Sequence, residues 1–201
     1  MVSEQPTPAG TAGPADAAPA EGNRDVADHG VDDQLAHLLD DPTTADLRAK
    51  VTEAWRDFAR SLAGAIGDLP SGGVLELTLD PTASGTGDAV YSVTVRAAEE
   101  GRVVALAVGN AVLPIGYRMD RSAVADLVAL GWSPPGVVEG SRGHFGLLST
   151  VGDTPRLAVT VSRTLRDVYG APHPAFLVYH AQDAEEAPLP ISPLGTARPE
   201  A

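Results

Sequence analysis

Histidines, serines and acidic residues are the side chains of this 201-residue chain whose types could do chemistry. None of the histidines has a neighbour at the spacing that places two imidazoles on one helix face toward a metal ion. The five are His29, His37, His144, His173 and His180. Because His173 lies between two prolines, we expect it to shape a turn. The histidines therefore predict no metal site.

Nucleophiles and phosphate-binding loops are equally poorly supported by the sequence. Residues 85–87 read Gly-Thr-Gly, but a phosphate loop must open onto a helix N-terminus, and these residues are expected to join two strands. Ser122 lies near Asp126, yet the sequence places no histidine to activate it. The acidic pairs at 99–100 and 185–186 are expected to be solvated charges. We predict no catalytic, cofactor-binding or metal-binding residues, and no enzyme.

The composition points to a cytoplasmic protein. Cysteine is absent, which excludes disulfides, thiolate metal sites and cysteine nucleophiles together. The longest apolar run, residues 103–108, is too short to span a membrane. The N-terminus lacks the basic start and apolar block of a secretory signal. We therefore expect no membrane partner.

The charge is unevenly distributed along the chain. The net charge is -13, and residues 1–43 alone hold nine acids and one base. Residues 44–182 are nearly neutral, with 14 acids and 12 bases. A nucleic-acid binder needs a clustered basic face, so nucleic acid is not expected as a partner. The acidic ends favour solubility, with occupation of a basic partner site as the alternative.

The same shift in composition predicts the domain boundaries. Residues 1–43 form an expected disordered tail rich in Ala, Pro, Gly and acids, within which residues 31–39 can form one or two helical turns. Residues 44–182 contain enough apolar side chains for one domain with its own core. Residues 183–201 are expected to be a disordered C-terminal tail.

The first half of the domain predicts a helix and a strand meander. Apolar side chains recur at helical spacing over residues 44–66. They are Val51, Trp55, Phe58, Leu62 and Ile66. Alternating patterns predict strands at residues 74–79 and 90–96, followed by an apolar strand at 102–108. The short links, 80–88 and 99–101, read as hairpin loops.

The second half predicts two helices and two strands. Asp120 can cap a helix at residues 121–130, and strands are expected at 144–149 and 175–180. Residues 155–169 fit a strand by their alternation, but their longer spacing and the Gly170 after them favour a helix. The order α-β-β-β-α-β-α-β predicts an α+β fold, a mostly antiparallel sheet with helices packed on it.

Several short motifs carry a resemblance to a known family over roughly residues 50–182. They are residues 54–59 (AWRDFA), Leu130-Gly131-Trp132 followed by two prolines, residues 164–170 (TLRDVYG), His173-Pro174 and residues 176–179 (FLVY). This combination resembles the actinobacterial YbjN-like proteins, peptide-binding chaperones related to type III secretion chaperones (TY-Chap). Most of these residues are of packing type.

The resemblance implies a non-covalent function. It implies an α+β fold in which a helix and a curved sheet form a dimer or a groove for another polypeptide, without a cofactor. The predicted function is shielding of an apolar segment of a client polypeptide, with a homodimer expected. The alternatives are a small-ligand-binding regulator or enzyme with an unrecognised site, and a partner that blocks one protein.

Five apolar residues near the ends of the predicted sheet are the candidates for partner binding. They are Trp132, Phe145, Leu148, Phe176 and Tyr179. A place in the core is the alternative for each. A sheet edge near them could recruit an extended peptide by main-chain pairing, and an apolar groove could instead accept an amphipathic helix.

Overall fold

The computed structural model describes residues 44–80, 82 and 90–200. The predictions for residues 1–43, including the helical turns at 31–39, lie outside the described residues, as does most of the loop at 80–88. None of the helices in the described part of the chain combines the length and the apolar character that a bilayer crossing demands.

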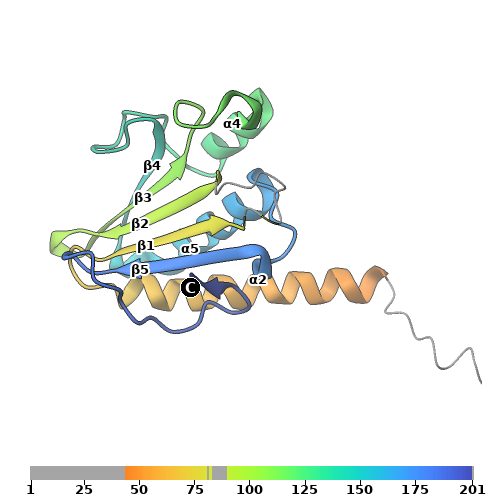
Figure 1. Cartoon of the computed structure of the whole chain (residues 1–201), viewed down its shortest axis with the longest axis horizontal. Coiled ribbons are helices and arrows are strands. Elements are labelled where there is room, and N and C mark those ends of the chain that lie inside the picture. The colour runs from red at the N-terminus through yellow and green to blue at the C-terminus, as the bar shows by residue number, and fades with distance from the viewer. Residues whose placement is uncertain (1–43, 81, 83–89, 201) are drawn as a thin grey trace, which may run out of the picture. The chain divides into compact units, whose positions relative to one another are not determined.

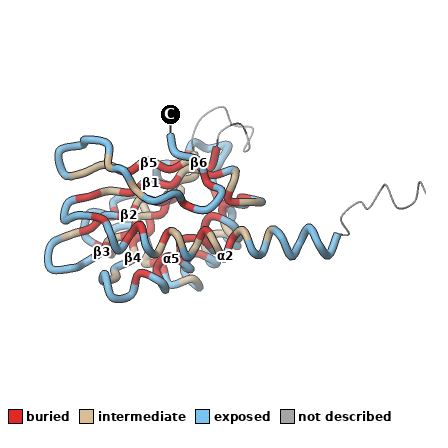
Figure 2. Tube along the Cα trace, turned by 90° about the horizontal axis from the view of Figure 1, so that it is seen from below, coloured by how far each residue is buried: buried red, intermediate tan, exposed pale blue. Residues whose placement is uncertain are grey.

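The helix α2 (Thr44–Gly67), which opens the described part of the chain, follows the predicted apolar stripe. Trp55, Phe58, Leu62 and Ile66 are buried, and Val51 is half-buried against them. Spacings of three and four residues put these side chains on one face of the helix. The first turns of α2 are exposed, and buried positions recur only further along it (Figure 2).

A six-stranded sheet is the centre of the described fold (Figure 1). The strands are β1 (Val74–Leu79), β2 (Ser92–Ala97), β3 (Arg102–Val108), β4 (His144–Thr150), β5 (Leu177–Gln182) and β6 (Arg198–Pro199). Their spatial order is β4-β3-β2-β1-β5-β6, and all neighbours are antiparallel except the parallel pair β5 and β6. The fold is α+β with a mostly antiparallel sheet, as predicted.

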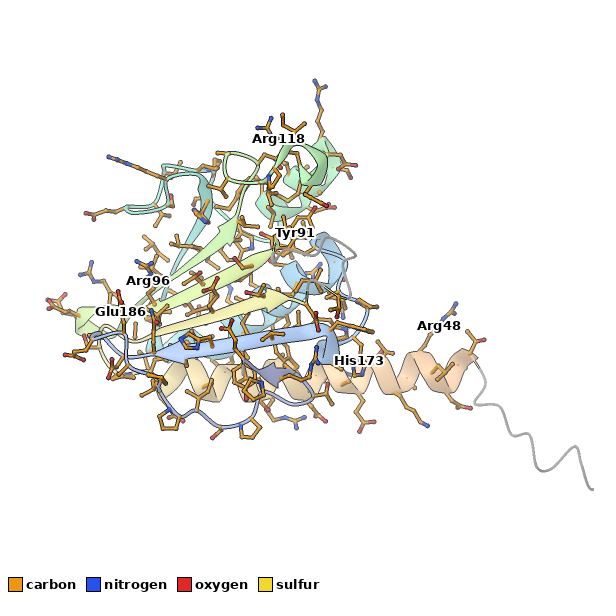
Figure 3. The ribbon with its side chains drawn as sticks, viewed as in Figure 1. Arg48, Tyr91, Arg96, Arg118, His173 and Glu186 are labelled. Carbon is orange, nitrogen blue, oxygen red and sulfur yellow. The ribbon has the colours of Figure 1, made fainter. Side chains whose placement is uncertain are left out.

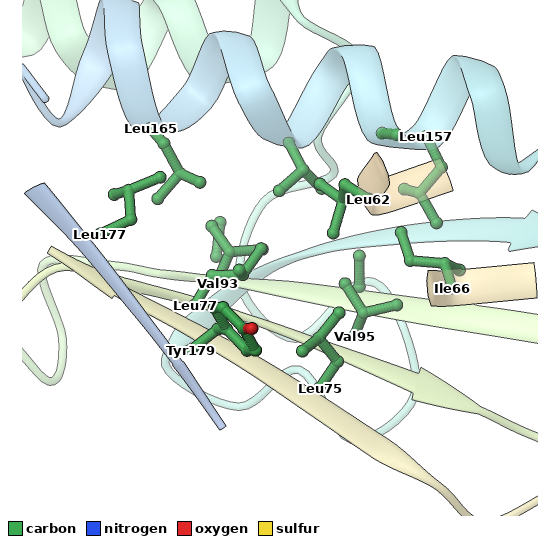
Figure 4. Close-up of a cluster of buried hydrophobic side chains, with 14 of the residues drawn as sticks. Leu62, Ile66, Leu75, Leu77, Val93, Val95, Leu157, Leu165, Leu177 and Tyr179 are labelled. Atoms are coloured by element: carbon green, nitrogen blue, oxygen red, sulfur yellow. The ribbon is translucent and has the colours of Figure 1, made fainter. Parts of the chain in front are cut away.

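The core lies between one face of the sheet and the helices. Leu75 and Leu77 of β1 and Val95 of β2 are fully buried, because alternate residues of a strand point to the same face. Figure 4 shows Leu62 of α2 and Leu157 of α5 above this inner face. The opposite, outer face of the sheet is wetter.

The helix α4 (Arg121–Ala129) begins where the sequence predicted and ends one residue before the predicted end, with Leu130 as its C-cap. The Asp120 carboxylate accepts a hydrogen bond from the Ala123 amide at 2.8 Å, which satisfies one of the free amides of the first turn. Gly131 has a φ of 100°, a left-handed conformation that glycine adopts without steric cost.

Residues 155–169, whose pattern fits both a strand and a helix, are helical. Their longer-range apolar spacing therefore predicted the structure better than their alternation. The segment forms α5 (Thr154–Arg163) and continues into the π-helical turn η4 (Thr164–Val168). Leu157, Val161 and Leu165 are buried. The remaining short elements are 3-10 turns: η1 (Glu99–Gly101), η2 (Ile115–Tyr117), η3 (Val151–Asp153) and η5 (Pro174–Phe176). The His173 ring accepts a hydrogen bond from the Ala175 amide at 3.1 Å, so this histidine shapes a turn.

The expected disorder of the C-terminal tail is wrong for residues 183–200. Leu194 is fully buried, Ala197 is buried, and β6 pairs with β5. The segment has no helical or strand period of its own, which is why its composition predicts disorder. Its isolated apolar side chains instead fill gaps that the rest of the domain provides.

Candidate functional site

The outer face of the sheet carries exposed and half-buried side chains from four neighbouring strands. Cross-strand partners place Val74, Arg96, Val104 and Leu148 in one row across four strands on this face. Val74 and Val104 are half-buried, whereas Arg96 and Leu148 are exposed. Figure 3 shows Arg96 among the side chains of the sheet. One charged side chain therefore lies among three apolar ones in a partly accessible row.

The strand β4 lies at the edge of the sheet, and part of its backbone is unpaired. Gly146 exchanges two hydrogen bonds with Ser133 on the side away from β3, at 2.8 and 3.0 Å. Because backbone direction alternates along a strand, Leu148 and Thr150 direct their amides and carbonyls to that same side. No described residue forms a hydrogen bond with the backbone of Leu148 there. A short stretch of open edge follows Gly146.

A cavity of about 530 Å³ adjoins this open stretch. Val104 and Leu148 form its apolar floor, and the Leu148 side chain is 64% exposed. Arg102 and Glu139 stand at its rim, and Ala98, Ser149 and Thr150 complete the lining. An apolar floor with a few polar groups around it is typical of a binding groove.

The loop 133–143 forms one wall of this groove. Val138 is buried over β4, and a Cβ added to Gly146 would come within 2.5 Å of the Val138 Cβ. The Ser141 hydroxyl donates to the Val138 carbonyl at 2.7 Å and accepts from the Gly136 amide at 3.1 Å. These contacts hold the loop, and hence Glu139, against the sheet.

The structure separates the five predicted partner-binding residues into two groups. Trp132, Phe145 and Tyr179 are buried in the core. Leu148 is exposed in the groove, and Phe176 is 41% exposed in the turn before β5. Since β3, β2 and β1 lie between β4 and β5, the structure does not bring Leu148 and Phe176 to one site.

Of the seven residues that line the groove, Leu148 alone was predicted from the sequence, and the six others include Val104, Arg102 and Glu139. Val104 could have been found from the sequence, because its strand is apolar on both faces. One of these two faces had no predicted packing partner. Arg102, at the start of the same strand, could have been assigned to the rim by its position. Nothing in the sequence marks Glu139 as a groove residue, since only the folding of the loop 133–143 brings it to the groove.

The titratable groups with shifted pKa values lie away from this groove. Hydrogen bonds from Thr82, with a further contribution from Arg198, lower the pKa of Asp80. The hydrogen bond from Arg166 is the main cause that lowers the pKa of Asp167. Burial raises the pKa of Tyr169. Within the described residues, no three His, Cys, Asp or Glu side chains are grouped so that they could hold a metal ion.

Comparison with known proteins identifies the class of this chain. Residues 48–183 match the family described as T3SS (YopN, CesT) and YbjN peptide-binding chaperone 3, TY-Chap3. The chain therefore belongs to the TY-Chap3 family of peptide-binding chaperones. The comparisons with curated proteins and with solved structures gave no match.

Proposed function

We propose that this chain is a non-catalytic, cytoplasmic peptide-binding protein that shields an apolar segment of a client polypeptide. The observation that carries the proposal is the open edge of β4 beside the apolar groove, at Leu148. Family membership supports a polypeptide as the ligand. The groove supports non-covalent binding through its floor and edge.

The geometry favours binding of an extended segment. A client strand can pair with the backbone of Leu148 and Thr150, where main-chain hydrogen bonds give affinity without reading the sequence. Alternate client side chains would then point toward Val104 and Leu148, so apolar residues at every second position fit best. Arg102 and Glu139 can receive polar groups that flank the apolar residues.

A homodimer would use the same edge. Two copies of β4 can pair as antiparallel strands, because each presents the same unpaired backbone to its partner. Such pairing would cover Leu148 in both copies. Client binding and dimer formation through β4 therefore compete in this proposal, and an added client should shift a dimer toward monomers.

The test compares two glutamate substitutions in the full chain. Leu148→Glu places a charge in the groove, and Val159→Glu places one on α5, where the side chain is also exposed, at 51%. The probe is a set of fluorescent peptides with valine or leucine at alternate positions, measured by anisotropy. We expect Leu148→Glu to weaken binding at least about tenfold, because a buried unpaired charge is costly, and Val159→Glu to leave it unchanged.

Two results would contradict the proposal. One is the absence of binding by the unsubstituted chain to every peptide of the set. The other is equal binding by the two variants, which would place the ligand elsewhere. Thermal unfolding of both variants serves as the control, since substitutions at exposed positions should change stability little.

A further inference from the structure

The C-terminal strap, defined here as residues 188–200, covers the edge of the sheet opposite β4. It lies beyond the family match, which ends at residue 183. The Leu189 amide donates to the Ala181 carbonyl and the Glu200 amide to the Tyr179 carbonyl, both at 2.8 Å. Next to the second of these bonds, Arg198 and Pro199 of β6 pair in parallel with Val178 and Tyr179 of β5. The strap therefore adds to the sheet as a bound peptide would.

Leu194 is the main apolar anchor of the strap, while Leu189 and Ile191 are half-buried against the core. Leu194 is fully buried, although the residues on both sides of it are exposed. Gly195 has a φ of 57°, and a Cβ there would lie 3.3 Å from the Phe58 nitrogen and Cα of α2. The strap thus passes close to the backbone of α2, where a side chain at position 195 would have to displace helix atoms. A leucine followed by a glycine fits this place.

A charged anchor lies four residues further along the strap. The guanidinium of Arg198 pairs with one carboxylate oxygen of Asp80. The other oxygen accepts hydrogen bonds from the amide and the hydroxyl of Thr82, at 2.8 and 2.7 Å. The side chain of Asp80 is mostly buried and that of Arg198 mostly exposed. Asp80 is therefore held by its own loop, and Arg198 approaches it from outside.

The strap is lightly attached compared with the strands of the sheet. Leu194 and Ala197 are its buried residues, and β6 is two residues long and contains a proline. The turn that joins the strap to β5, at residues 184–187, is exposed. Segments with few buried apolar contacts open locally at a small part of the free energy of global unfolding.

We propose that the edge of β5, the site in the core that buries Leu194 and Asp80 form a second peptide-binding groove, which the strap of the same chain fills. The ligands of this groove are peptides with a leucine, a glycine directly after it, and an arginine four residues after the leucine, which make a turn between the two anchors as the strap does, where the Ala197 amide donates to the Leu194 carbonyl at 3.0 Å. The strap is a built-in competitor, so an external peptide binds only when the strap is released. This inference does not depend on the groove at Leu148.

The first experiment adds the strap as a separate molecule. A fluorescent peptide of residues 188–200 (PLPISPLGTARPE) is titrated into the full chain and into the full chain carrying Leu194→Ala with Arg198→Ala. These substitutions loosen the strap and leave the groove intact. We expect at least about tenfold tighter binding to the variant, because its groove is open more often. Equal binding by both proteins, or no binding by the folded variant, would overturn the inference.

Control peptides test the two anchors separately. A peptide with aspartate in place of Leu194, and one with glutamate in place of Arg198, should each lose most of the binding to the variant. The full chain with Leu148→Glu added to the two strap substitutions should still bind the unaltered peptide. Loss of binding in that protein would place the peptide in the β4 groove and would overturn the inference, while leaving the proposed function standing.

Hydrogen exchange of the unsubstituted chain supplies a second, independent measurement. The amides of Leu189 and Glu200 should exchange by local opening, faster than the Leu79 amide, which donates to the Tyr91 carbonyl in the sheet. The strap amides should still exchange faster than the Leu79 amide when a low concentration of denaturant slightly lowers the free energy of global unfolding. If the strap amides exchange only together with the Leu79 amide, the strap is a permanent part of the fold and the inference fails.

Discussion

The indole nitrogen of Trp132 donates a hydrogen bond to the Thr164 hydroxyl over 2.8 Å in the buried core. That hydroxyl in turn donates to the Thr160 carbonyl at 2.9 Å. Thr164 begins the π-helical turn η4, in which the Tyr169 amide reaches back to the Thr164 carbonyl at 3.0 Å. The pair therefore joins the segment after α4 to the end of α5, which explains why Trp132 is part of the core and not of a partner surface.

Substitution by phenylalanine should destabilise the chain to different extents at the two tryptophan positions. Trp55 is also buried, but its ring nitrogen has no hydrogen-bond partner among the described residues. Trp132→Phe removes a buried hydrogen bond, so we expect it to lower the free energy of unfolding by about 1–3 kcal/mol more than Trp55→Phe. Urea unfolding of both variants measures the difference. An equal loss in the two variants would show that the Thr164 contact contributes little.

Alanine at Gly146 should loosen the wall of the β4 groove. The added Cβ would meet two carbons of Val138, at 2.5 and 2.8 Å, so the loop 133–143 must move. We expect a loss of about 1–3 kcal/mol in the free energy of unfolding. The matched control is Gly64→Ala in α2, where nothing lies within 4 Å of the new Cβ and a gain of about 0.5–1 kcal/mol is expected. Thermal unfolding that ranks Gly146→Ala at or above the unsubstituted chain would refute this account of the loop.

Acid should weaken the contact between Asp80 and the strap. Hydrogen bonds from Thr82 and the charge of Arg198 hold the pKa of Asp80 below its ordinary value of 3.8. The ionised carboxylate therefore stabilises the fold at any pH above 3.8, and this contribution is lost as the pH falls through the lowered pKa. Asp80→Asn should be less stable than the unsubstituted chain at neutral pH, with a difference that narrows below about pH 4. Unfolding free energies at a series of pH values test this, and a constant difference would contradict it.

Alkali should leave Tyr169 protonated in the folded chain. Its hydroxyl donates to the Val108 carbonyl at 2.9 Å, and its ring stacks on that of Tyr91 with centroids 5.1 Å apart. Burial, with a smaller contribution from Tyr91, raises the pKa of Tyr169 above the ordinary 10. The stabilisation is present below pH 10 and is lost as the pH rises through the raised pKa. Absorbance titrations of the folded chain and of Tyr169→Phe should therefore coincide until unfolding begins, and an extra phenolate signal before that point would contradict the assignment.

Much of the local structure followed from the sequence alone. The spacing of Trp55, Phe58 and Leu62 predicted α2, and the alternation of Leu75 and Leu77 predicted β1. These predictions succeed because they depend on periods of 3.6 and 2, which neighbouring residues determine. Side-chain capping by Asp120 is equally local. The family resemblance likewise depended on short packing motifs.

The candidate surfaces depended on tertiary structure. Phe145 and Leu148 are three residues apart in one strand and point to opposite faces, so only the position of β4 beside β3 decides which one is exposed. Arg198 meets Asp80 across 118 residues of sequence, and Leu194 is fully buried although its own segment has no apolar period. Such contacts are long-range. Local pattern therefore determined the elements, and the packing of distant elements decided which edges of the sheet are open and which are filled.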